Sequence, residues 1–529
     1  SLGIRASILR KEGTSGGFSR SKGGVGYFLK EDLSESGENS GSMGGKDSGA
    51  HATPTPRRRG ARPRPGLPAS ARNNDGGYFM QYISTRGEQT PKRFSDILFE
   101  GRAEDGGLYV PAAFPRLTLD QIRVMRGLDY AGLALEVMHL FWPELDRPTL
   151  WKLCRDTYQP EFYPYGRDRI SSREVTPITW LHDDVGLLEL SNGPTLSFDD
   201  ISLSLLANIF ARGLGNAPAT MTFLGATTGD MGAACEHAFA EIPNARVAML
   251  SPQGRMSDWQ AAQLYANAPA NSVNLAVDGT FDDCQALVKS AFMDEELNRH
   301  MKLTSANSIN VARFLPQSFY YFNAYAQLDK IGKADQLVVS VPSGNFGNIT
   351  AGLFAHRMGL PIKRFVAANN RNDVFLEYLH TGVYTPRPSV PTIANAMDVG
   401  DPSNFARILD LYGKNGNPHA EISQLISGYR FTDEEIGATM KQVYNETGYV
   451  LDPHGACGYQ ALIDNKLAPN ETGLFLEPAH PAKFKGTVDK ILDADIEIPA
   501  KLKAFMQGEK QSVGMEKDFE TFKSYLLAQ

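Results

Sequence analysis

Short apolar runs with the character of β-strands recur along the chain from residue 221 onward. The run at 221–225 leads through a glycine-bearing turn into a helical pattern that extends to Phe239, and further runs also alternate with helical stretches. Strands that alternate with helices at this spacing predict a parallel sheet with helices on both faces, and therefore an α/β fold. The other predicted strands are 246–250, 272–277, 336–341 and 364–368.

Residues 80–180 lack this alternation and have a mostly helical pattern, with proline and tryptophan scattered through it. We therefore expect a separate N-terminal domain over 80–180 and a doubly wound body over 181–529. The length of 529 residues also favours two or three domains.

Residues 1–79 form a basic leader of low complexity. The stretch 57–68 combines five arginines with three prolines, and glycine and serine dominate elsewhere. Such a composition cannot bury enough apolar surface to fold alone, so we expect a disordered segment. Its first 30 residues hold six basic side chains and one acidic side chain. This balance is typical of an organelle transit peptide, and we expect a mitochondrial location, with the cytoplasm or a plastid as alternatives.

Charge is distributed unevenly between the leader and the rest of the chain. The leader has 13 Lys or Arg against 7 Asp or Glu, a net of +6. Because the whole chain carries −7, residues 80–529 carry −13. A body this acidic argues against direct nucleic-acid binding.

The remaining composition narrows the class of protein further. The four cysteines, Cys154, Cys235, Cys284 and Cys457, are too few and too far apart for a disulfide framework, so we expect buried thiols in a reducing compartment. The ten histidines form no HExxH motif and no zinc-spaced cluster, so no metal site is expected. No apolar run approaches the roughly 18 residues of a membrane-spanning helix.

A glycine-bearing loop follows the predicted strand 336–341 and precedes a helical stretch at 349–358. Backbone N–H groups in such a loop, together with the positive end of a helix, form a site for phosphate. An ordinary tight turn is the alternative. The loop lacks the Walker lysine and the GxGxxG spacing, which weakens nucleotide-binding interpretations. Its residues are Ser343, Gly344, Asn345, Phe346, Gly347 and Asn348.

Eight segments in a fixed order resemble threonine synthase, in the bacterial and fungal form with a long N-terminal domain. Each is weak alone, whereas the ordered set is specific. They are 83–87 (ISTRG), 105–111 (DGGLYVP), 190–195 (LSNGPT), 225–230 (GATTGD), 307–310 (NSIN) with Arg313, 343–348 (SGNFGN), 395–398 (NAMD) and 479–484 (AHPAKF).

This resemblance implies a fold type II pyridoxal-phosphate (PLP) enzyme, related to the tryptophan synthase β subunit, with a body in two lobes. Members convert O-phosphohomoserine and water to threonine and phosphate. The loop 343–348 resembles the seat of the cofactor phosphate. The pocket for the substrate phosphate corresponds to Asn307, Ser308, Asn310 and Arg313, since a guanidinium can hold phosphate with two hydrogen bonds. Arg86 and Arg255 are weaker candidates, with solvated surface arginines as the alternative.

The chain departs from the family at the residue that carries the chemistry. The family has Phe-Lys-Asp where this sequence has Phe198-Asp199-Asp200. The family lysine holds PLP as an imine and moves protons, and an aspartate can do neither. Between residues 187 and 301 the single lysine is Lys289. We therefore expect no covalently bound cofactor and no intact catalytic residue.

Two further departures fall on the expected cofactor site. Pro478 stands where the family has a threonine that resembles a partner of the pyridine nitrogen, and proline offers neither a hydroxyl nor an N–H. Losing one such hydrogen bond costs about 1 kcal/mol. Met231 replaces a second threonine with a thioether that cannot donate.

Structural signals around Asp199 remain intact. Ile201, Leu205, Ile209 and Phe210 form an apolar helical stripe, and Ser197 to Asp200 fits a Ser-x-x-Asp cap at a helix start. A residue at the start of a helix is thus the structural interpretation of Asp199.

Three functions remain open. The first, which we favour, is a pseudoenzyme kept as a structural or interaction subunit of a larger assembly, with residues 1–79 as the arm that contacts a protein partner. The second is an active threonine synthase, either with a different lysine or with an experimental substitution at position 199. The third is a protein that binds PLP or a phosphorylated small molecule without turnover. The third fails if other side chains fill both the loop 343–348 and Arg313.

Overall fold

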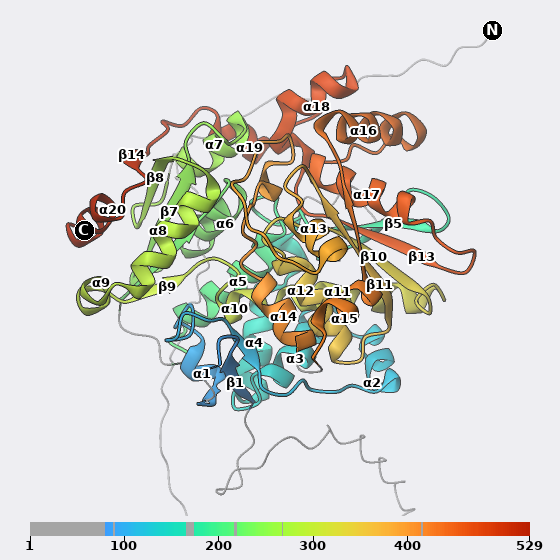
Figure 1. The fold of residues 1–529 in the computed structure, drawn as a ribbon, viewed down its shortest axis with the longest axis horizontal. Coiled ribbons are helices and arrows are strands. Elements are labelled where there is room, and N and C mark those ends of the chain that lie inside the picture. Colours follow the sequence, from blue (N-terminus) through green and yellow to red (C-terminus); the bar gives the residue numbers. More distant parts are fainter. Residues whose placement is uncertain (1–79, 88–89, 165–173, 216–219, 267, 414–415) are drawn as a thin grey trace, which may run out of the picture. The chain divides into compact units, whose positions relative to one another are not determined.

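Two β-sheets with mostly parallel strands form the body of the protein, as the computed structural model shows (Figure 1). The structure describes residues 80–87, 90–164, 174–215, 220–266, 268–413 and 416–529, so the predicted leader 1–79 lies outside the described residues. All described residues belong to the unit Pro65–Gln529.

The first sheet has the order β12-β11-β10-β13-β5-β4, and every neighbouring pair is parallel except β4 with β5. The second has the order β14-β8-β7-β6-β9 and is parallel throughout. The first sheet consists of β4 (Ile178–Trp180), β5 (Val185–Glu189), β10 (Leu337–Pro342), β11 (Ile362–Asn369), β12 (Ile426–Arg430) and β13 (Thr472–Glu477). The second consists of β6 (Met221–Ala226), β7 (Ala245–Pro252), β8 (Ser272–Asp278), β9 (Leu303–Ser305) and β14 (Val513–Glu516).

Helices surround both sheets, as the alternating sequence pattern predicts. The five predicted strands correspond to β6, β7, β8, β10 and β11. The α/β fold class is therefore confirmed. The helices of the body are α5 (Asp199–Ala211), α6 (Asp230–Phe239), α7 (Asp258–Tyr265), α8 (Phe281–Met293), α9 (Glu295–His300), α10 (Val311–Phe314), α11 (Gln317–Lys330), α12 (Gly347–Arg357), α13 (Val374–Thr381), α14 (Phe405–Gly413), α15 (Pro418–Leu425), α16 (Asp433–Thr447), α17 (Pro453–Asn465), α18 (Lys485–Leu492), α19 (Ala500–Phe505) and α20 (Phe519–Leu527).

The N-terminal region is mostly helical, as predicted, but it also contains a small antiparallel sheet that the sequence pattern did not reveal. Its strands are too short to show an alternating pattern. They are β1 (Gln81–Ser84), β2 (Lys92–Arg93) and β3 (Tyr109–Pro111), and the helices are α1 (Phe94–Ile97), α2 (Leu119–Val124), α3 (Tyr130–Phe141) and α4 (Arg147–Thr157). The hydroxyl of Tyr82 donates to the carbonyl of Phe141 at 2.8 Å and ties this sheet to α3.

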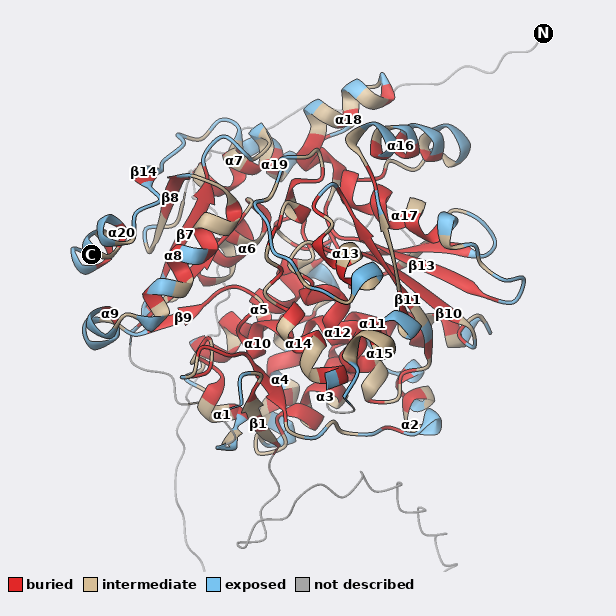
Figure 2. Cartoon of the chain, viewed as in Figure 1, coloured by how far each residue is buried: buried red, intermediate tan, exposed pale blue. Residues whose placement is uncertain are grey.

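The core follows the strands and the inner faces of the helices (Figure 2). All four cysteines are buried free thiols, as expected. Ile201, Leu205, Ile209 and Phe210 are buried as well, so α5 packs through the predicted stripe. Within the described part of the chain, no helix is long and apolar enough to cross a membrane.

The start of α5 corrects one sequence prediction. The helix begins at Asp199 after Phe198, and no side-chain cap forms. The carboxylate of Asp200 instead accepts hydrogen bonds from the backbone N–H and the hydroxyl of Thr195, at 2.9 and 2.7 Å. The predicted Ser197–Asp200 cap is therefore wrong, because the chain before the helix competes for the same carboxylate.

Candidate functional site

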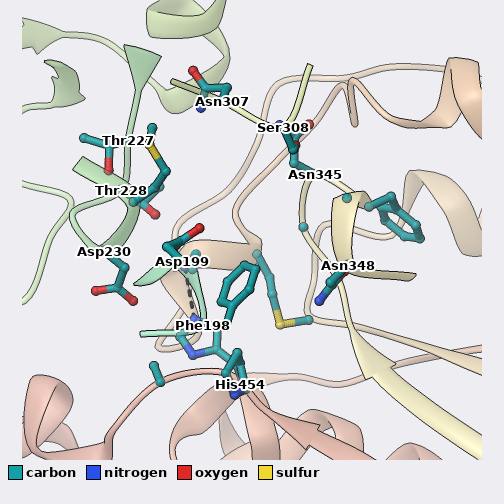
Figure 3. A pocket seen from close by; sticks show the side chains of 18 of the residues that line it. Phe198, Asp199, Thr227, Thr228, Asp230, Asn307, Ser308, Asn345, Asn348 and His454 are labelled. Carbon is teal, nitrogen blue, oxygen red and sulfur yellow. Dashed lines mark hydrogen bonds between the residues drawn. The ribbon is translucent and has the colours of Figure 1, made fainter. Parts of the chain in front are cut away.

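A cavity of about 120 Å³ lies where the loops that follow β6, β10 and β13 come together (Figure 3). Loops at the carboxyl ends of parallel strands are the usual ligand-binding position in open α/β sheets. The cavity lining includes Thr227 and Thr228 after β6, the loop at 343–348 after β10, and Pro478 after β13. Chain topology thus brings together three segments that are more than 100 residues apart in sequence order.

The loop 343–348 connects β10 to α12, and five of its six residues line the cavity. Among the described residues, no acceptor bonds the backbone N–H groups of 344–348. Phe346 has φ +57°, in the left-handed region that a non-glycine residue rarely adopts. Consecutive free N–H groups at the start of an 11-residue helix form an anion site.

Side chains of the loop support its conformation rather than fill it. The amide of Asn348 donates to the carbonyl of Pro342 and accepts from the hydroxyl of Ser343, both at 2.8 Å. A Cβ at Gly344 would lie 2.5 Å from the carbonyl oxygen of Ala396, so packing alone already demands this glycine. The turn and the anion site therefore require the same residues.

Asp199 and Arg313 meet beside the cavity. The guanidinium donates through Nη2 to Asp199 Oδ1 and through Nη1 to the hydroxyl of Ser202. The second oxygen of Asp199 accepts from Ser197 Oγ at 3.0 Å. Asp199 is 4% exposed and Arg313 is 2% exposed, so the charges meet away from solvent. Burial raises the pKa of Asp199, and Arg313 opposes this rise by favouring the ionised carboxylate.

The predicted substrate-phosphate residues do not all face the cavity. Asn307 and Ser308 line it, as does Arg313. The amide of Asn307 pairs with the N–H and carbonyl of Ala226 at 2.9 and 2.8 Å, which joins this segment to the end of β6. Asn310 is buried outside the lining and caps α10, where its Oδ1 accepts from the N–H of Ala312 at 2.9 Å. Its role is to orient the helix that carries Arg313.

The two weaker arginine candidates are surface residues. Arg86 and Arg255 are exposed, and neither lines the cavity. Arg86 donates to the carbonyl of Asp105 at 3.2 Å. The alternative interpretation, solvated arginines, fits both positions.

Pro478 and Met231 line the cavity at the positions that depart from the family. The carbonyl of Pro478 accepts from the N–H of Phe198 at 2.8 Å, so this residue holds the start of α5 and offers no donor to the cavity. Figure 3 shows Phe198 near the centre of the lining side chains.

A buried lysine lies close to the site, which sequence distance had concealed. Lys483 is fully buried and its Nζ lies 2.8 Å from Asp230 Oδ1, while it donates to the carbonyl of Thr195 at 2.9 Å. Asp230 lines the cavity, whereas Lys483 lies behind it. The sequence did not point to Lys483 as a substitute amine because this lysine is 284 residues from Asp199 in the chain. Its membership in the AHPAKF segment was the available signal.

His454 lines the cavity and is another residue that the sequence did not single out. Its Nε2 accepts from the N–H of Ala396 at 3.1 Å and its Nδ1 lies 2.6 Å from Asp452 Oδ1. Because Nε2 accepts, Nδ1 carries the proton and donates to Asp452. Nε2 therefore holds the segment at 395–397, while Nδ1 fixes the ring on Asp452. No group of three or more potential metal-ligating side chains occurs in the described ranges.

The architecture of two parallel sheets around this cavity is that of a fold type II PLP-dependent enzyme. The family model for pyridoxal-phosphate dependent enzymes matches residues 176–476, and those for the N terminus and C-terminal part of threonine synthase match 81–158 and 455–526. The chain belongs to the threonine synthase family.

Individual relatives agree with this assignment. Threonine synthase of Haemophilus influenzae is 40% identical over 435 residues, which cover 82% of this chain and 96% of the relative. The crystal structure of threonine synthase from Escherichia coli has a TM-score of 0.77 at 37% identity, covering 85% of this chain and 100% of that one. A PLP-bound threonine synthase from Brucella melitensis has a TM-score of 0.74 at 34% identity, with 85% and 99% covered.

The residues of this chain fit PLP at one end only. The free N–H groups of 344–348 suit its phosphate. At the other end, no lysine lines the cavity among the described residues, and Pro478 offers no donor to a ring nitrogen. The cavity, at about 120 Å³, is also smaller than the roughly 300–1,000 Å³ of common ligand pockets. We therefore derive no reaction step through PLP.

Proposed function

We propose that this member of the threonine synthase family does not catalyse threonine formation and serves as a structural or interaction subunit of a larger assembly. The observation that carries this proposal is the buried contact between Asp199 and Arg313. At the position of the family lysine there is a carboxylate, and the arginine expected to hold the substrate phosphate already has an anionic partner. The position therefore lacks the amine that the reaction needs, and its carboxylate engages the arginine that would bind the substrate phosphate.

A carboxylate cannot replace the lysine by chemistry. It has no nitrogen with which to form an imine, and an ionised carboxylate held by a guanidinium is a weak base. A substrate phosphate would have to compete with Asp199 for the guanidinium of Arg313. Transfer of the guanidinium to a phosphate would leave Asp199 as a buried carboxylate without its cation, which opposes substrate binding.

The relatives favour an active threonine synthase as the alternative, because those compared carry that name. Such an activity would require another amine, and Lys483 is the buried lysine beside Asp230. That amine is ion-paired and donates to a carbonyl, so it would have to leave both partners before it could react.

The deciding experiment measures phosphate release from O-phosphohomoserine by the full chain with added PLP, with an active threonine synthase as the positive control. We expect release no faster than in the absence of protein. Release well above that background would overturn the proposal. The variant Lys483→Met would then show whether Lys483 provides the missing amine.

A second candidate function is the binding of a phosphate-bearing small molecule without turnover. The observation in its favour is the set of free N–H groups at 344–348, which other side chains leave open although Asp199 occupies Arg313. Inorganic phosphate should then raise the melting temperature of the full chain more than sodium chloride at equal ionic strength. An equal response to both salts would remove this candidate.

Residues 1–79 are the proposed contact with a protein partner and the proposed mitochondrial targeting segment. Their net charge of +6 supports both proposals. The test compares a fluorescent fusion of the full chain with one that lacks residues 1–79. Loss of mitochondrial signal on deletion supports targeting, whereas an unchanged distribution argues against it. The protein partner is tested by the native mass, in mitochondrial extract, of the full chain and of the form that lacks residues 1–79. A larger mass for the full chain alone supports the proposed contact.

A further inference from the structure

Arg407 is a fully buried cation without a carboxylate partner. It lies on α14, has 0% exposure, and no Asp or Glu in the described part of the chain lies within ion-pair distance. Its hydrogen bonds all go to neutral acceptors. Burial lowers the pKa of Arg407 to about 9, so the side chain remains charged at neutral pH.

A cation in this situation is unusual, because burying a charge is costly unless an opposite charge offsets it. Two other buried cations at the cavity have carboxylate partners: Arg313 contacts Asp199, and Lys483 contacts Asp230. Arg407, in contrast, has only neutral hydrogen-bond acceptors, so no direct partner offsets its positive charge behind the cavity wall.

The contacts of Arg407 lead directly to the cavity. Its Nη1 donates to the carbonyl of Ser308 at 2.5 Å, and its Nη2 donates to the carbonyl of Ile309 at 2.8 Å. Ser308 lines the cavity. The Nε of Arg407 donates to the carbonyl of Tyr109 in the N-terminal region at 3.2 Å. Arg407 thus holds the cavity segment against β3.

A second path runs through Asn404. Its Oδ1 accepts from Arg407 Nη1 at 2.6 Å, and its Nδ2 donates to Ser308 Oγ at 2.8 Å and to the carbonyl of Asn345 at 3.1 Å. Asn345 belongs to the loop with the free N–H groups. A Cβ at Gly347 would lie 3.0 Å from Ser308 Oγ, so this hydroxyl also faces the loop.

We propose that Arg407 is a positioning residue for the anion site at 344–348 and supplies the fixed positive charge that a bound phosphate group offsets. The inference rests on the second candidate function, that this loop binds phosphate. The positive ends of N–H dipoles at the loop and an unmatched guanidinium behind it act on the same anion. The ligand class is a phosphate monoester or inorganic phosphate, because the loop offers donors and the cavity is small.

The test uses inorganic phosphate as the probe and the full chain as the protein. Thermal unfolding and calorimetric titration compare phosphate with sodium chloride at equal ionic strength. We expect Arg407→Met to weaken phosphate binding at least tenfold and Arg407→Lys to weaken it less, because lysine keeps the positive charge but cannot reproduce the hydrogen bonds of the guanidinium. Arg126→Met, which removes an exposed arginine paired with Asp329, is the matched control and should bind as the unchanged protein does.

Asn404→Asp separates electrostatics from packing. It places a carboxylate of nearly the same shape on Arg407 and should weaken phosphate binding about as much as Arg407→Met, even if the latter fails to fold. Unchanged phosphate binding in Arg407→Met or Asn404→Asp overturns the role of Arg407. If the unchanged protein responds equally to phosphate and chloride, the phosphate-binding function fails, and the inference about Arg407 fails with it.

Discussion

The carboxylate of Asp199 accepts a hydrogen bond from the guanidinium of Arg313, a residue 114 positions away in the chain. The contact joins the first residue of α5 to α10, and Ser202 on α5 accepts a second hydrogen bond from the same guanidinium. The position that would hold a cofactor lysine thus stabilises the packing of two helices. The contribution of this pair to stability is open to direct measurement.

Removal of the carboxylate should destabilise the protein. In Asp199→Ala the guanidinium of Arg313 stays buried without an anion, and we expect a loss of about 3–5 kcal/mol in the free energy of unfolding. Urea unfolding measures it. Arg126→Met at the exposed pair with Asp329 should cost less than about 1 kcal/mol. The double variant Asp199→Ala, Arg313→Met should lose less than the sum of the single variants, and additive losses would contradict a direct pair.

A small carboxylate should restore part of that loss. In Asp199→Ala, formate can enter the space beside Arg313 and replace the missing carboxylate, so its addition should raise the melting temperature. Neither the unchanged protein nor the double variant with Arg313→Met should respond to formate beyond the effect of chloride. A formate response that persists without Arg313 would show that the anion binds elsewhere.

Return of the lysine should allow PLP to attach without giving full activity. In Asp199→Lys the new amine lies beside Arg313, whose positive charge lowers the amine pKa and favours its nucleophilic form. Borohydride trapping followed by mass spectrometry should find a covalent PLP adduct in this variant and none in the unchanged protein. An adduct on Lys483 of the unchanged protein would contradict the proposed loss of chemistry.

Phosphate release by Asp199→Lys should remain low, because Pro478 still offers no hydrogen-bond donor. Adding Pro478→Thr restores a hydroxyl and should raise the rate, since one such hydrogen bond is worth about 1 kcal/mol, or roughly fivefold. Equal rates for the single and double variants would show that Pro478 does not limit the reaction.

Stability should depend on pH through Glu236, a buried residue of α6. Its carboxyl accepts from Asn274 Nδ2 at 2.8 Å, and burial raises its pKa from 4.5 to about 8. A raised folded-state pKa means that the stabilising contribution is complete below about pH 4.5 and is lost as the pH rises through 8. Glu236→Gln removes this dependence. At pH 8 the variant should therefore exceed the unchanged protein by more than about 1 kcal/mol in the free energy of unfolding. This difference should shrink toward pH 5. Parallel curves of unfolding free energy against pH for the two proteins would contradict this role of Glu236.

Much of the fold was predictable because its signals are local. The strands β6, β7, β8, β10 and β11 are continuous apolar runs between helical patterns, which is the expected form of buried parallel strands. The strands β9 and β14 have three and four residues, and the small sheet β1–β3 is equally short. Such elements form because tertiary pairing stabilises them, so their sequences carry little pattern of their own.

The candidate site likewise has features that the sequence predicts and features that it does not. The loop 343–348 was predictable because strand, glycine turn and helix are consecutive, and the replacement of lysine by Asp199 is visible by comparison with the family motif. The partners of charged side chains were not predictable. Lys483 beside Asp230 and the unmatched charge of Arg407 depend on distances in space.

The sequence by itself determined the family, the parallel α/β fold and the absence of an amine at position 199, because these follow from residue type and from periodicity along the chain. Only the tertiary structure decided that Asp199 neutralises Arg313, that the N–H groups of 344–348 stay free, and that Arg407 is buried without a counter-charge. Electrostatic and hydrogen-bond energies depend on separation and burial, and both quantities exist only once distant segments have packed together.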